Sequence, residues 1–116
     1  MLKDGIVLQD REGKVTFNHY SFCELLKYLM VELAGISYEH AAELVEESPL
    51  SEPTDDIDKV GLYSHEYCYF WAMHICYGHC YWHKGIPAQP EDMDAYMRLE
   101  DRIIQEHQLK EPFEWE

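Results

Sequence analysis

The chain has 116 residues, of which 47% are hydrophobic, and a formal net charge of −14. This length predicts a single domain over 1–116, and this composition excludes a globally disordered chain. Nine basic residues against 23 acidic ones exclude direct binding to nucleic acid or to an anionic membrane surface, because both need a basic patch. A basic protein partner remains compatible with this charge.

The acidic residues form two blocks on either side of a neutral centre. Residues 39–60 carry eight acids and one base, residues 91–116 carry nine acids and three bases, and residues 61–90 carry one of each. We find no signal-peptide pattern at the N-terminus and no apolar run near the roughly 20 residues that cross a bilayer. We therefore expect a cytoplasmic protein whose four cysteines are free thiols.

The first predicted element is a β-hairpin over about 5–17. An apolar run at 5–9 and a polar–apolar alternation at 14–17 predict two strands. Residues 10–13 supply turn chemistry between them, and Gly13 can take a positive φ. A hairpin is only marginally stable alone, so we expect it to pack on the helices.

A first helix is predicted at about 22–34. Ser21 and Glu24 form the pattern of a capping box, which places the helix start directly after Ser21. Leucines at i, i+3, i+4 spacing indicate one buried face. Gly35 is the expected left-handed residue that ends the helix.

A second helix is predicted at about 38–48, followed by a long loop. Ser37 is its expected N-cap, and Pro49 ends it because the residue before proline avoids the helical conformation. Two prolines and several acids predict a solvated acidic loop over 48–61.

A long helix at about 64–83, with Ser64 as its N-cap, is predicted as the buried centre. Residues 61–85 hold three of the four cysteines, four of the seven histidines and two of the three tryptophans. Gly78 interrupts this stretch, and a glycine costs a helix about 1 kcal/mol against alanine, so the helix could continue through it or end there. Trp71 has apolar neighbours one turn away on both sides and is predicted as a core anchor.

The last helix is predicted at about 90–107, with Pro90 at its first position. The tail carries Phe113 and Trp115, which we expect to dock on the body or on a partner. The elements together predict a mainly α (α+β) fold, a compact four-helix domain with an N-terminal β-hairpin.

The candidate metal ligands share one stripe if the central helix continues through Gly78: Cys76, His79, Cys80 and His83. Thiolate and imidazole are the ligands that zinc prefers. One stripe offers a tetrahedral ion at most two or three ligands, so another element would have to complete the site. The competing interpretation is packing without a cofactor, because cysteine and histidine are often core residues. Apolar surroundings raise a thiol pKa, and no orienting group is visible, so we predict no catalytic residue.

Four aromatic residues are predicted to bind a partner if they are exposed, because aromatic anchors dominate interfaces: Tyr81, Trp82, Phe113 and Trp115. The leading prediction is a non-catalytic protein-interaction or regulatory module with a protein partner, basic in character. One alternative is a Cys/His-rich helical zinc domain, and a second is an acidic nucleic-acid mimic that inhibits a DNA-binding protein. The 16 aromatic residues also predict a homodimer that covers exposed aromatic surface, although the net charge opposes it.

Overall fold

The computed structural model describes residues 2–116 and contains five α-helices, two 3-10 turns and one three-stranded sheet. This confirms the predicted mainly helical fold with an N-terminal hairpin, with one helix and one strand more than expected. In chain order the elements are β1 Ile6–Gln9, β2 Lys14–Phe17, α1 His19–Ala34, α2 Tyr38–Glu47, η1 Pro49–Ser51, α3 Ile57–His65, α4 Cys68–Tyr77, η2 Tyr81–Lys84, α5 Met93–Glu106 and β3 Phe113–Trp115.

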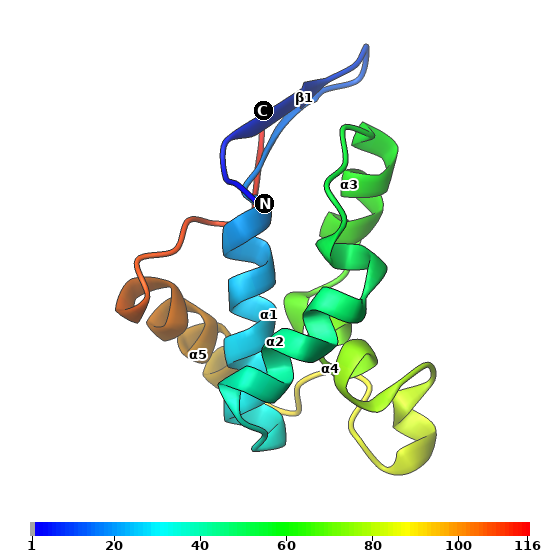
Figure 1. Ribbon diagram of the computed structural model, residues 1–116, viewed down its shortest axis with the longest axis vertical. Coiled ribbons are helices and arrows are strands. Elements are labelled where there is room, and N and C mark those ends of the chain that lie inside the picture. Colours follow the sequence, from blue (N-terminus) through cyan, green and yellow to red (C-terminus); the bar gives the residue numbers. More distant parts are fainter. Residues whose placement is uncertain (1) are drawn as a thin grey trace.

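Helix α1 is the central column of the molecule. Figure 1 shows the sheet at its N-terminal end, α3 and α4 to one side and α5 to the other. The helix packs against α2, α4 and α5, so most of its surface is removed from water and a broad rather than a narrow apolar face is required. Its fully buried apolar residues are Phe22, Leu25, Leu26, Leu29 and Met30.

The predicted hairpin is confirmed, and the C-terminal tail adds a third strand to it. In the sheet β2 lies between β1 and β3, and Phe17 is paired with Ile6 on one side and with Phe113 on the other. The rings of Phe17 and Phe113 stack with centroids 5.3 Å apart and planes 3° from parallel. The turn is closed by Asp10, whose carboxylate accepts a hydrogen bond from the Gly13 amide at 3.1 Å.

The junction between β2 and α1 holds both ends of the chain through Asn18, which is 1% exposed. The Asn18 side-chain oxygen accepts from the Gly5 amide at 2.8 Å, and its amide nitrogen donates to the Glu111 carbonyl at 2.7 Å. The Asn18 backbone amide donates to the Pro112 carbonyl at 2.9 Å. One buried side chain therefore satisfies polar groups of two segments that are more than 90 residues apart.

The predicted capping box at Ser21 is wrong, because α1 begins at His19, three residues before the predicted start at 22. Ser21 lies inside the first turn, where its hydroxyl donates to Asp4 at 2.7 Å and accepts from the Lys110 amide at 2.9 Å. Glu24 is buried and accepts from the Tyr38 hydroxyl at 2.8 Å. Both residues of the apparent capping box thus make tertiary hydrogen bonds instead of closing the helix end.

The boundary between α1 and α2 follows the sequence signals. Gly35 is left-handed with φ of 72°, as a helix-ending glycine should be. The Ser37 hydroxyl accepts from the His40 amide at 3.1 Å and caps α2, which ends two residues before Pro49. The local signals therefore place both helix boundaries.

The predicted single helix over 64–83 is wrong, because the chain breaks between α3 and α4 and again at Gly78. The Trp71 indole donates to the Tyr63 carbonyl at 2.8 Å, in the last turn of α3 where carbonyls lack helical partners. The Tyr69 amide in the first turn of α4 donates to the Tyr96 hydroxyl at 2.9 Å. Gly78 then takes φ of 98° and ψ of 179°, a conformation that side chains disfavour.

Two further boundaries differ from the sequence prediction. The predicted loop over 48–61 ends early, because Asp56 caps α3 by accepting from the Asp58 amide at 2.9 Å. The last helix begins at Met93 rather than near Pro90, because the Asp92 carboxylate accepts from the Ala95 amide at 3.0 Å. In both cases an aspartate N-cap sets the helix start.

His19 opens α1 and is also fully enclosed, with 1% of its surface exposed. Its Nε2 lies 2.6 Å from the Leu50 carbonyl oxygen, and its ring stacks on Phe17 with centroids 4.6 Å apart. Burial lowers the pKa of His19 from its ordinary value of 6.5, against smaller raising effects of the Leu50 carbonyl and of Asp4. Native His19 is therefore neutral near pH 7.

Replacing Asn18 with alanine should lower the free energy of unfolding by about 2–3 kcal/mol, because the backbone groups of Gly5 and Glu111 lose the hydrogen bonds that this buried side chain makes. Amide exchange should become faster at Gly5 and in β3. Ser37→Ala is the control, because it removes an N-cap worth about 1 kcal/mol and leaves β3 unaffected. Unchanged protection of β3 in Asn18→Ala would show that the junction does not hold the C-terminal tail.

Acidification should destabilise the protein through His19. With a lowered folded pKa, the histidine contributes stability that is complete above its unfolded pKa of 6.5 and is lost as the pH falls toward the folded value. His19→Gln retains an N–H for Leu50 but does not titrate. Urea unfolding at about pH 7.5 and about pH 5.5 should therefore show a larger loss for the wild-type protein than for His19→Gln. Equal losses would contradict a neutral native His19.

Candidate functional site

Residues 78–90, which we call the 78–90 lobe, project from the end of α4. The lobe is anchored by Tyr81, which is 0% exposed and whose ring lies 6.4 Å from that of Tyr69 and 6.1 Å from that of Phe70 on α4, centroid to centroid. Within the lobe the Tyr81 hydroxyl donates to the Ala88 carbonyl at 2.7 Å. The Lys84 ammonium donates to the Tyr77 carbonyl, one of the carbonyls that the end of α4 leaves open. Cys80 is left-handed, with φ of 56°. The lobe is thus an ordered structure with its own buried anchor.

The stripe of candidate metal ligands does not form. Cys76 lies on α4, whereas His79, Cys80 and His83 lie beyond the break at Gly78, so the helical spacing that would align them is absent. The His79 ring lies 5.8 Å from that of His74, centroid to centroid. Across residues 2–116, no group of three or more His, Cys, Asp or Glu side chains is placed to hold a metal ion.

All four cysteines are free, and burial acts against the reactivity of three of them. Burial raises the pKa of the Cys76 thiol, raises that of Cys23 to about 12, and raises that of Cys68 well above its usual range. A thiol with a raised pKa is a poor nucleophile at neutral pH, because the thiolate is the reactive form. These three positions therefore have the properties of packing residues.

The four predicted partner-binding aromatic residues do not form one surface. Tyr81 is a core residue, so its prediction as an exposed contact is wrong. Phe113 is half-buried against Phe17, as expected for docking on the body. Trp82, on the lobe, is 41% exposed, and Trp115, on the sheet, is 48% exposed. Trp82 and Trp115 remain available to a partner, on separate elements.

A groove that the sequence did not predict lies between the lobe, α5 and the C-terminal part of α1. We call it the Tyr96 groove. It is a cavity of about 360 Å³ whose floor is formed by the buried residues Tyr69 and Tyr96, with Glu91 and Asp92 exposed at its edge. Its remaining lining is Leu33, Pro87, Pro90, Ala95 and Leu99. An apolar interior with a few polar groups is the usual composition of a binding site.

The floor of the Tyr96 groove is fixed by hydrogen bonds. The Tyr69 hydroxyl donates to the Pro87 carbonyl at 2.7 Å, and the Tyr69 amide donates to the Tyr96 hydroxyl at 2.9 Å. The two rings meet edge to face, with centroids 5.8 Å apart. Burial is the main cause of a strongly raised pKa of Tyr96, so its hydroxyl stays protonated. The groove is therefore held in shape before any partner arrives.

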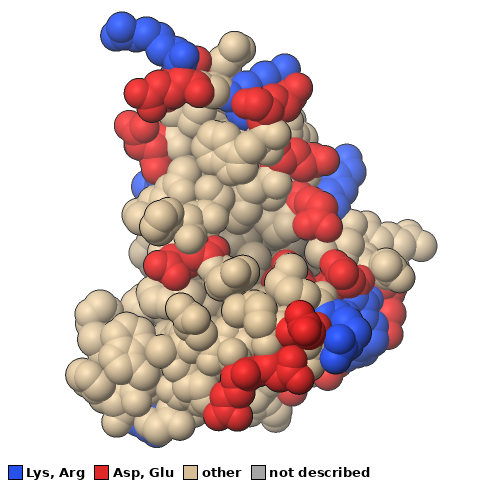
Figure 2. Space-filling view, turned by 180° about the vertical axis from the view of Figure 1, so that it is seen from behind, with Lys and Arg blue, Asp and Glu red and all other residues tan. Residues whose placement is uncertain are grey.

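The surroundings of the groove combine an uncharged surface with acids. Residues 67–90 carry one charged side chain, Lys84, in a chain of net charge −14. Figure 2 shows a broad uncharged area at the lower left, with acidic residues along its lower right margin. Asp92 is partly engaged as the N-cap of α5, and Glu91 forms no ion pair with any residue in 2–116. Glu91 can therefore accept a basic group from a partner.

Sequence patterns could not identify this groove. The sequence placed Tyr96 and Leu99 only within the last predicted helix, and Leu33 only within the first. The lining comes from α1, α4, α5 and the lobe, whose relative placement depends on the break at Gly78. The two exposed acids before α5 were the sole local signal, and helix capping explains them equally well.

Comparison with protein families, with characterised proteins and with solved structures found no match. Among the described residues, no helix has the length and apolar character needed to cross a membrane. The function must therefore be inferred from the site itself.

The packing and metal interpretations of the central stretch predict opposite melting results. Trp71→Ala should lower the free energy of unfolding by about 3 kcal/mol, because Trp71 packs edge to face on Tyr63 and bonds to its carbonyl. A chelator should leave the unfolding midpoint unchanged. Cys76→Ser is the control for thiol loss. A sharp fall of the midpoint on chelation would instead indicate a structural metal.

Proposed function

We propose that this protein is a non-catalytic protein-binding module whose Tyr96 groove receives an apolar side chain from a basic segment of a partner protein. The observation that carries the proposal is a preformed apolar groove with acidic residues at its edge, in a strongly acidic chain. The four free thiols support a reducing compartment such as the cytoplasm as its location.

The size and charge of the groove indicate what it can receive. A volume of about 360 Å³ is near the lower end of the roughly 300–1,000 Å³ of ligand pockets, which suits one or two side chains. Tyr69, Tyr96 and Leu99 favour a leucine, methionine or aromatic residue in the interior. Glu91 and Asp92 favour a lysine or arginine beside it, and the net charge of −14 speeds the approach of a basic segment.

Selection of random displayed peptides on the immobilised protein tests the proposal. The enriched peptides should place an apolar residue next to lysine or arginine, and their affinity should fall as salt is raised. Ala95→Arg should reduce binding at least about tenfold, because Ala95 is exposed, lines the groove and would carry a bulky cation into it.

Met97→Arg is the matched control, because Met97 is on the same helix, is 40% exposed and does not line the groove. Both variants add the same side chain and the same charge, so general electrostatic effects cancel. Equal binding by the two variants, or a selection that enriches no peptide, would refute the groove as the binding site. Trp82→Ala tests separately whether the lobe contributes a further contact.

A second copy of the chain is the other proposed partner. Light scattering at high salt, where repulsion between acidic subunits is screened, would detect such a homodimer. Dimerisation that Ala95→Arg abolishes and Met97→Arg retains would assign the groove to self-association. For the zinc alternative, no group of three or more ligands is placed to hold an ion among residues 2–116.

A further inference from the structure

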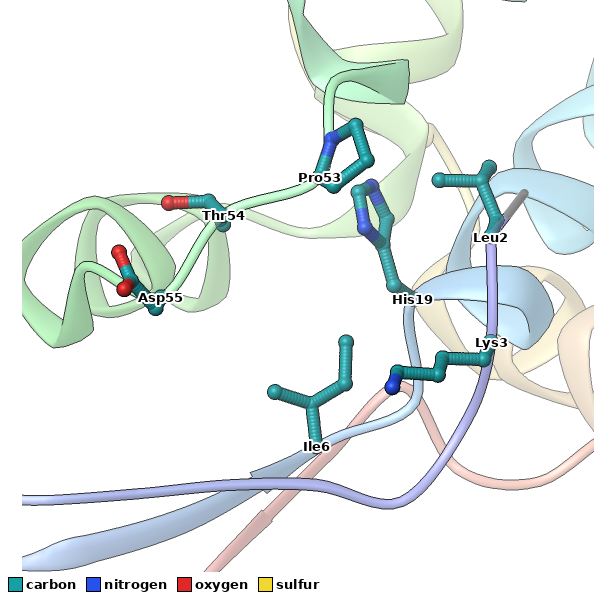
Figure 3. A pocket seen from close by; sticks show the side chains of 7 residues that line it. All are labelled: Leu2, Lys3, Ile6, His19, Pro53, Thr54 and Asp55. Atoms are coloured by element: carbon teal, nitrogen blue, oxygen red, sulfur yellow. The ribbon is translucent and has the colours of Figure 1, made fainter.

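A second cavity lies at the opposite end of the molecule, between the N-terminal segment and the loop that precedes α3. It has a volume of about 540 Å³, within the usual range for small-molecule pockets. Figure 3 shows His19 at its centre, with the N-terminal residues on one side and the loop on the other. Its lining is Leu2, Lys3, Ile6, His19, Pro53, Thr54 and Asp55.

His19, which lines the cavity, has an unsatisfied buried ring nitrogen. Nε2 of His19 lies 2.6 Å from the Leu50 carbonyl, which can only accept, so Nε2 carries the proton. Nδ1 is then a hydrogen-bond acceptor, and it is the one buried side-chain nitrogen or oxygen among residues 2–116 that has no partner. Figure 3 shows Nδ1 on the side of the ring that faces the hollow between Ile6 and Thr54. An unpaired buried acceptor is costly, so a donor at this place is stabilising.

The chemistry around Nδ1 defines what could supply that donor. Leu2, Ile6 and Pro53 give the cavity apolar walls. Lys3 and Asp55 are both exposed at its edge and carry opposite charges, so together they favour neither an anion nor a cation. A fitting ligand is therefore uncharged and mostly apolar.

An anionic ligand is disfavoured by His19 itself. Its lowered pKa, caused mainly by burial, keeps the imidazole neutral, so it offers no positive charge to an anion. Asp4 is close enough to act on this pKa, and its carboxylate is held in place by the Ser21 amide at 2.8 Å and the Ser21 hydroxyl at 2.7 Å. A second negative charge beside Nδ1 would be repelled by Asp4.

We propose that this cavity is a binding site for a small, uncharged, apolar molecule with one O–H or N–H group, which donates a hydrogen bond to Nδ1 of His19. Phenol is the simplest representative, with its ring against Leu2, Ile6 and Pro53 and its hydroxyl on Nδ1. The site is independent of the Tyr96 groove, since the two cavities share no residue.

The test is an NMR titration of the full-length protein, labelled with ¹⁵N, with phenol and with anisole. Anisole has a similar size and shape but cannot donate a hydrogen bond. Phenol should shift the Nδ1 resonance of His19 together with the amides of residues 2–6 and 54–55, with a dissociation constant on the order of 1 mM. Anisole should bind about tenfold more weakly and leave the Nδ1 resonance in place.

A pair of variants locates the binding. Ile6→Phe fills the cavity and should abolish the phenol-induced shifts, whereas Val7→Phe adds the same ring on the opposite face of β1 and should retain them. Val7 is 55% exposed and does not line the cavity. If Ile6→Phe fails to fold, the phenol–anisole comparison on the wild-type protein still decides the question.

Four results would overturn the proposal. Equal affinity for phenol and anisole would show an apolar hollow without donor recognition. Phenol binding that leaves the Nδ1 resonance unmoved, or that persists in Ile6→Phe, would place the ligand elsewhere. No response to phenol would indicate that an ordered water satisfies Nδ1 permanently.

Discussion

The fold depends on a buried polar junction where β2 meets α1. Asn18 bonds to Gly5 on one side and to Glu111 on the other, and the Ser21 hydroxyl next to it joins Asp4 to the Lys110 amide. Because the polar side chains of Asn18 and Ser21 are buried, they need hydrogen-bond partners within the protein. The two ends of the chain supply these partners and are therefore held at the junction. The three-stranded sheet follows from this constraint, because it brings β3 alongside β2.

A second set of tertiary hydrogen bonds shapes the opposite end of the molecule. Trp71 and Tyr96 satisfy backbone groups at the break between α3 and α4, and Tyr69 fixes the 78–90 lobe through the Pro87 carbonyl. The Tyr96 groove is the space that these contacts leave between the lobe and α5. Tyr96, which satisfies a backbone amide at the helix break, is thus also part of the proposed binding surface.

The two proposed sites differ in chemistry as well as in place. The Tyr96 groove is apolar with an acidic edge, which suits a basic protein segment. The His19 cavity has balanced charges at its edge and one buried acceptor, which suits a neutral donor molecule. Because α1 extends from one to the other, with His19 at its first turn and Leu33 at its last, a ligand in the cavity and a partner in the groove would contact the same helix.

The sequence by itself determined the helical class, the hairpin and the helix boundaries at Gly35, Ser37 and Pro49. These features are encoded by residues within one turn of each other, through backbone conformations and caps that need no distant partner. The predictions that were wrong concern residues whose hydrogen-bond partners lie far away in the sequence. The apparent capping box at Ser21 and Glu24 is used by tertiary partners, and the segment that leads into the third strand is held by hydrogen bonds between residues 89 and 93 positions apart.

In the candidate site, too, local features could be predicted from the sequence and features that depend on distant contacts could not. The prediction of 61–85 as the buried centre is wrong, because α1 is the central column and, of the eight aromatic residues in 61–85, three are buried: Tyr63, Tyr69 and Tyr81. The sequence did identify Gly78 as a position where the helix could end. It could not show that the chain breaks between α3 and α4, because the Tyr69 amide and the Tyr63 carbonyl are satisfied by side chains from other positions. Three features were decided only by the tertiary structure: the separation of the predicted metal ligands at Gly78, the burial of Tyr81 and the formation of the Tyr96 groove. Each depends on which distant side chains form hydrogen bonds with the free backbone groups at the helix ends.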